Sequence, residues 1–290
     1  MTFLREPTHF TPDTCVLGRD GVDWSPIASA GAMSAFCGIM AGFVLAGLVT
    51  VIGQKNPQGG DGHASRGLKL FLPCFIGLAT ASYLYALTSG ELVCTRAITE
   101  QLFFGAILAA DALIVVVALA WLLPAYDRNK HGEVRFFRGL IQFTAQFAML
   151  MIIISADGFN NSVLERHVNI WATVLVYGGG VAFMCAILFV WRKPLPQAPP
   201  PPTPLPNGLS PADWPEYWRD ELLLNRRVEV AARTAVTVGG LLAVPGGWVV
   251  GIAWNHWTSV ASWLAYTLSG VTLVLPGLAI VTAVRSAPRA

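Results

Sequence analysis

The stretch 101–125, QLFFGAILAADALIVVVALAWLLPA, constrains this chain more than any other part of it. It is apolar over the roughly 20 residues that an α-helix needs to cross the hydrocarbon layer of a membrane. Its single charged side chain is Asp111, near the middle. A carboxylate at that depth is strongly disfavoured unless it faces the interior of a bundle, is protonated or is paired. The stretch therefore predicts further membrane helices around it.

Six more apolar stretches of similar length occur in the chain. In lipid every backbone polar group must be hydrogen-bonded internally, so such stretches form helices. Only 12% of the 290 residues are Asp, Glu, Lys or Arg, well below the proportion in soluble domains. The sequence predicts an all-α, polytopic membrane helix bundle with seven transmembrane helices, at 27–53, 69–90, 101–125, 139–157, 170–191, 234–254 and 261–284.

A proline-rich segment divides these spans into five and two. Residues 192–212 have no helical pattern and favour extended polyproline II structure. The polar tail 1–26 and the five-helix region 27–191 precede this cytoplasmic linker. Residues 213–230 predict an amphipathic helix, which lies on the membrane interface or docks on the bundle or a partner. The two-helix region 231–290 follows.

The distribution of basic residues predicts the orientation of the chain. With seven spans, 15 of the 19 Lys and Arg residues fall in alternate loops on one side. Because cytoplasmic loops carry the excess of Lys and Arg, we expect the N-terminus outside and the C-terminus in the cytoplasm of a multi-pass plasma membrane protein. The net charge of +2 gives no reason to expect nucleic acid. The expected partners are the lipid bilayer and a second copy or another membrane protein.

Asp111 is the strongest candidate for a functional residue. It lies roughly 15 Å below the outer end of its span, near the membrane midplane. Thr80 and Tyr83 on the second span and Gln146 on the fourth reach a similar depth, and Gln142 shares a face with Gln146. Because no Lys or Arg lies mid-span, we expect a protonated carboxyl, a bound cation or a water-lined cavity. The alternative is a neutral, hydrogen-bonded aspartic acid that fixes helix packing.

Two later spans contain residues that interrupt helices. Pro245, Gly246 and Gly247 lie in the sixth span and Pro276 in the seventh. Transporters use the backbone groups freed by helix breaks to coordinate substrates. The alternative is a simple kink whose backbone groups are satisfied by neighbours.

Small residues recur at every fourth position of the first span: Ala30, Ser34, Gly38, Gly42, Ala46 and Thr50. Gly38 and Gly42 form a GxxxG pair. Such a stripe lets another helix approach closely. Ser34, Gly38 and Gly42 are therefore predicted packing residues, either within the chain or between two copies.

The predicted outer surface carries scattered polar residues. Glu91 and Glu100 lie in the loop before the third span and are interpreted as part of a solvated acidic rim. Cys15 in the tail and Cys94 in the same loop both face the outside, where disulfides persist, so the two can pair. Two free thiols are the alternative, because the sequence does not supply their distance.

Several classes of membrane protein are disfavoured. All five His residues fall outside the spans, which argues against a heme bundle, and the last lysine is Lys193, so no retinal attachment site lies in the seventh span. No nucleophile motif of an intramembrane enzyme is present. We expect that the protein is not an enzyme and that it binds no cofactor or metal. The first hypothesis is small-solute or ion translocation through Asp111, and the second is a non-catalytic scaffold or regulatory subunit.

Overall fold

The regular structure of the chain is helical throughout its described part. A computed structural model describes residues 25–53, 61–126, 131–163, 170–192, 215–251 and 260–288. Those residues form seven helices and no strands: α1 (Pro26–Gly53), α2 (Asp61–Thr88), α3 (Cys94–Tyr126), α4 (His131–Val163), α5 (Ile170–Arg192), α6 (Pro215–Gly251) and α7 (Ser262–Ser286). Each of the seven predicted spans overlaps one of these helices, so the all-α fold is confirmed.

Six of the seven helices are long and apolar enough to cross a membrane, judged on the described residues. The described apolar part of α5, Val176–Arg192, is shorter than those of the others, within a helix of 23 residues. A multi-pass membrane helix bundle therefore fits the fold. A crossing by α5, which would make the count seven, stays a prediction.

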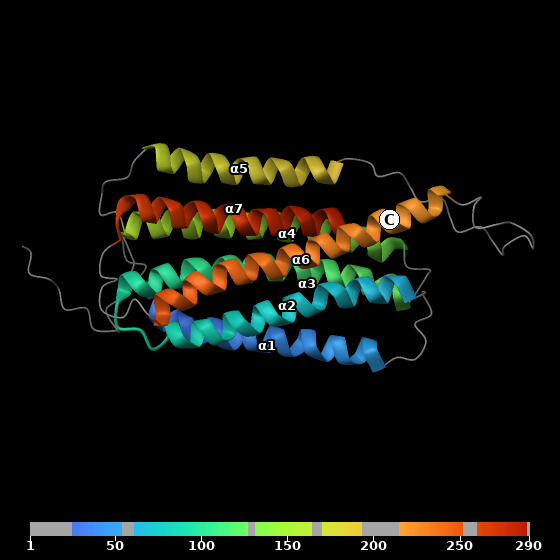
Figure 1. Ribbon diagram of the computed structural model, residues 1–290, viewed down its shortest axis with the longest axis horizontal. Coiled ribbons are helices and arrows are strands. Elements are labelled where there is room, and N and C mark those ends of the chain that lie inside the picture. Colours follow the sequence, from blue (N-terminus) through green and yellow to red (C-terminus); the bar gives the residue numbers. More distant parts are fainter. Residues whose placement is uncertain are drawn as a thin grey trace, which may run out of the picture.

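The helices run side by side with α3 in the middle of the bundle (Figure 1). Helix α3 contacts α1, α2, α4, α6 and α7, whereas α5 packs at the edge against α4 and α7. A helix that is apolar on all sides is stable when other helices surround it. The position of α3 agrees with the apolar character of 101–125.

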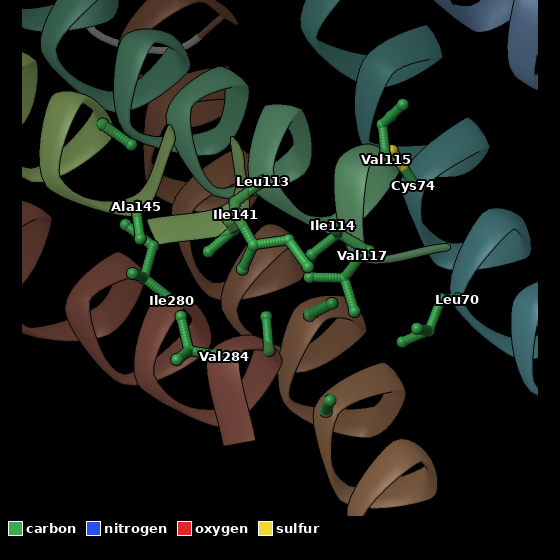
Figure 2. Close-up of a cluster of buried hydrophobic side chains, with 14 of the residues drawn as sticks. Leu70, Cys74, Leu113, Ile114, Val115, Val117, Ile141, Ala145, Ile280 and Val284 are labelled. Atoms are coloured by element: carbon green, nitrogen blue, oxygen red, sulfur yellow. The ribbon is translucent and has the colours of Figure 1, made fainter. Parts of the chain in front are cut away.

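Figure 2 shows how the middle of α3 is enclosed. Its side chains Leu113, Ile114 and Val117 are at most 1% exposed. The labelled residues around them come from α2, α4 and α7: Leu70, Cys74, Ile141, Ala145, Ile280 and Val284. The buried side chains in the middle of α3 thus connect α2 with α4 and α7.

Helix α2 begins at Asp61, before the predicted start of its span. The Gly-rich residues 61–68, expected in a loop, form its first turns. A Cβ at Gly67 would overlap the Leu122 side chain of α3, and the Arg66 guanidinium lies 4.9 Å from the centre of the Trp121 ring. Packing on α3 therefore stabilises a helical segment whose glycine content disfavours a helix by itself.

Helix α6 is continuous across the predicted boundary at residues 230 and 231. It has 37 residues and is about 55 Å long, which exceeds the roughly 30 Å of a hydrocarbon core. Its first part extends past the neighbouring helices (Figure 1). Leu222 is 66% exposed, but Val228 and Ala231 are buried. The amphipathic segment predicted at 213–230 is, from Pro215 on, the first part of this long helix.

The predicted helix breaks do not interrupt α6 or α7. Pro245 lies inside α6 and Pro276 inside α7. A Cβ at Gly246 would overlap the Phe104 ring of α3, and a Cβ at Gly277 would lie 2.9 Å from the Phe183 ring of α5. These glycines make room for aromatic rings, and α6 and α7 remain helical at the prolines.

Candidate functional site: the Asp111 carboxyl

Asp111 lies in the middle of α3 and is 5% exposed. Its carboxyl group points at α2, where it occupies the space that a side chain at Gly77 would need. A Cβ built on Gly77 would overlap the Oδ2 atom of Asp111. Gly77 therefore determines how closely the carboxyl approaches the α2 backbone.

Two cysteines complete the surroundings of Asp111. Cys74 on α2 donates a hydrogen bond from Sγ to the backbone oxygen of Asp111, at 3.4 Å. The Cys37 thiol of α1 is close enough to interact electrostatically with the carboxyl. The carboxyl thus lies at the seam between α1, α2 and α3.

The Oδ2 atom of Asp111 is buried and has no hydrogen-bond partner among the residues that the structure describes. Buried polar atoms are nearly always paired, and an unpaired one calls for a specific explanation. An ionised carboxylate in this position is strongly disfavoured. The site therefore suits a carboxyl that carries a proton or binds a small cation.

The four side chains predicted as partners of Asp111 have other contacts or surroundings. Gln146 donates from Nε2 to the backbone oxygen of Met184 on α5, at 3.2 Å. Tyr83 is 65% exposed, whereas Thr80 and Gln142 are half-buried. None of these four side chains hydrogen-bonds Asp111 within the described part of the chain. The sequence missed Gly77, Cys74 and Cys37, although Cys74 and Gly77 lie one turn apart on α2.

The small-residue stripe of α1 contacts α2 only along its first half. Ser34 and Ser82 exchange hydrogen bonds, each hydroxyl donating to the other's backbone oxygen at 2.8 and 2.9 Å. A Cβ at Gly38 would lie 3.2 Å from Ser82 Oγ, but nothing lies within 4 Å of one at Gly42. Positions four apart rotate about 40° per step around a helix with 3.6 residues per turn. The stripe therefore leaves the interface before Gly42.

A second group of buried charges lies where α2 is joined to α3. Glu91 is 5% exposed and accepts hydrogen bonds from Nε and Nη2 of Arg96. Glu100 is fully buried, and its Oε1 lies 3.8 Å from Arg96 Nε. The interpretation of both glutamates as a solvated rim is wrong. Helix α3 begins at Cys94, seven residues before the predicted span, and this places Arg96 and Glu100 one turn apart inside the bundle.

The opposite end of the bundle is held by a buried arginine. Arg66 of α2 donates from Nε to Asn225 Oδ1 of α6 at 2.8 Å and stacks on Trp121 of α3. Trp121 Nε1 in turn donates to the backbone oxygen of Ser286 on α7 at 2.9 Å. These contacts join four helices and indicate a structural role.

The cysteine prediction is tested only in part. Cys94 is in a disulfide, and Cys37, Cys74 and Cys185 are free. Cys15 lies outside the described residues, so its pairing with Cys94 stays a prediction.

Comparison with known proteins adds no further evidence on this site. No family model, no curated protein and no solved structure matches the chain. The function is therefore inferred from the geometry of the site.

Proposed function

We propose that this protein is a multi-pass membrane protein that translocates an ion or a small solute, with Asp111 as the group in the path that binds a proton or a small cation. The observation that carries the proposal is the buried Oδ2 atom, which has no hydrogen-bond partner among the described residues. The proposed arrangement has seven spans in the plasma membrane, an outside N-terminus and a cytoplasmic C-terminus, as the basic residues favour.

The lack of a partner separates this proposal from a purely structural role. Polar side chains that hold membrane helices together do so by hydrogen bonds across helices. The Oδ2 atom of Asp111 makes no such bond to a described residue, whereas Ser34, Ser82 and Gln146 all do. A carboxyl that alternately binds and releases a proton or cation must not be held in a permanent hydrogen bond.

The test is proton flux in liposomes that contain the purified protein. We expect wild-type protein to dissipate an imposed pH gradient, read by an internal pH-sensitive dye, and Asp111→Asn to abolish the flux. Glu229→Gln is the matched control, because it makes the same carboxyl-to-amide change in an exposed ion pair with Arg233. A folded Asp111→Asn protein with wild-type flux would remove Asp111 from the mechanism.

One observation favours the second candidate, a scaffold that engages another membrane protein. Helix α1 presents large apolar side chains to the outside of the bundle, with Phe43 69% and Ile52 72% exposed. Gly31, Gly42 and Gly47 on the same helix have open space at their Cβ positions. Cysteine cross-linking from position 42 in membranes tests this alternative, since a scaffold would give a discrete cross-linked product and a lipid-covered face would not.

A further inference from the structure

The group formed by Glu91, Arg96 and Glu100 is not used by the proposed function. Among the described residues it combines two buried carboxyl groups with one guanidinium, and both oxygens of Glu100 lack a hydrogen-bond partner. If both glutamates were ionised, the group would hold an uncompensated negative charge away from water. Such a charge is strongly disfavoured, and two adjacent carboxylates rarely ionise together.

The contacts of Arg96 distinguish the two carboxyl groups. Both Nε and Nη2 of Arg96 donate to the same Glu91 oxygen, whereas Glu100 Oε1 lies 3.8 Å from Arg96 Nε. The side chains of Glu91 and Thr88 adjoin the Glu100 carboxyl. An ionised Glu100 cannot donate to them, but a protonated one can. A proton on Glu100 therefore explains why its oxygens accept no hydrogen bond from a described residue.

The residue that follows Glu100 is neutral and joins α3 to α1. Gln101, next to Glu100, donates from Nε2 to the backbone oxygen of Pro26 and lies 3.1 Å from Ser29 Oγ, which fixes the start of α1 against α3. Among the described residues, the ionisable neighbours of Glu100 are Glu91 and Arg96. Tyr85 lies one turn before Thr88 on α2.

We propose that Glu91 and Glu100 share one proton beside the Arg96 guanidinium, so that this end of the bundle is a proton-binding site separate from Asp111. Loading forms one O–H bond on Glu100 with a proton from water, and release returns that proton to water. The inference does not depend on translocation through Asp111.

The test measures thermal unfolding of the full-length protein in detergent as a function of pH. We expect the wild-type midpoint to fall as pH rises, because loss of the shared proton leaves two buried carboxylates against one guanidinium. Glu100→Gln keeps a neutral hydrogen-bond donor and should abolish this component of the pH dependence. Glu229→Gln, in an exposed Arg–Glu pair, should retain the wild-type dependence.

Infrared spectroscopy gives a second readout. We expect the band of a protonated carboxyl at neutral pH to weaken in Glu100→Gln, and also in Glu91→Gln, where Arg96 becomes available to ionise Glu100. The same comparison in the Asp111→Asn background removes any contribution of Asp111. An unchanged band and an unchanged pH dependence in Glu100→Gln would overturn the proposal. A wild-type midpoint that rises with Na⁺ at constant pH and ionic strength would overturn it too, because a metal ion would then balance the charge.

Discussion

At the scale of single residues, glycines decide where the polar groups of this bundle lie. Gly77 leaves room for the Asp111 carboxyl and Gly38 lets Ser82 approach α1, whereas Gly42 faces open space. The same residue type thus has opposite consequences at positions that the sequence does not distinguish. Substitution of each glycine by alanine distinguishes the two kinds of position by the change in stability.

We expect Gly77→Ala to destabilise the protein by about 1–3 kcal/mol, the usual cost of overpacking. Alanine is the better helix former by roughly 0.5–1 kcal/mol, so Gly42→Ala should be neutral or stabilising. Thermal unfolding in detergent compares the two variants. Combining Gly77→Ala with Asp111→Ala should recover part of the loss, since the smaller side chain removes the overlap. Equal effects of Gly77→Ala in both backgrounds would contradict this contact.

At the scale of elements, long helices tie distant parts of the chain together. Helix α6 extends beyond its neighbours (Figure 1), and its first part is fixed to α2 through Asn225 and Arg66. A hydrogen bond to a charged group contributes about 1.5–3 kcal/mol. The extension is therefore expected to be ordered mainly by this contact and by Val228, which is fully buried.

Asn225→Ala should speed amide hydrogen exchange in the first turns of α6 by about tenfold, because those turns open more often without the Arg66 contact. Arg226→Ala changes an exposed neighbour and should leave exchange unchanged. Hydrogen–deuterium exchange with mass spectrometry resolves the two variants. Equal exchange in both would show that other contacts hold the extension.

A second close contact of α6 is that of Gly246 with Phe104 of α3. Gly246→Ala would place a Cβ against the Phe104 ring, whereas nothing lies within 4 Å of the same change at Gly240. We expect a loss of about 1–3 kcal/mol for Gly246→Ala only. Partial rescue by Phe104→Leu, measured by thermal unfolding, would assign the loss to this contact.

At the scale of the whole molecule, the number of crossings decides the topology. Six helices meet the length and apolarity needed, and the described apolar part of α5 is shorter. If α5 crosses, its two ends face opposite sides of the membrane and 15 of the 19 Lys and Arg residues fall on one side.

Single cysteines introduced at Ile170 and Arg192 test this crossing in intact cells with a membrane-impermeant maleimide. We expect Ile170→Cys to react at once and Arg192→Cys only after the membrane is opened, each measured above the wild-type signal. Ser89→Cys serves as the outside reference and Gly53→Cys as the inside one, because both exposed positions precede α5 and their sides do not depend on its crossing. Equal labelling of positions 170 and 192 would remove the fifth crossing.

The sequence predicted the helices well because apolar length alone specifies a membrane span. It did not predict the partners of Asp111, because depth along a helix does not determine which face meets which neighbour. Gln146 has the right depth but faces α5. Glu91 and Glu100 were assigned to a solvated rim because the start of α3 is polar, although the spacing of Arg96 and Glu100 is that of a helical ion pair. The α1 stripe was predicted only in part, because a repeat of four drifts around the helix.

The arrangement around α3 also bears on how the chain is made. Four residues next to the charged groups Arg96 and Asp111 of this helix come earlier in the sequence. Glu91 pairs with Arg96, and Asp111 is adjoined by Gly77, Cys74 and Cys37. When the ribosome has completed α3, these companions have therefore already been synthesised. The polar groups can then be sheltered during insertion, and the later helices join a nascent three-helix unit whose buried charges already have their neighbours.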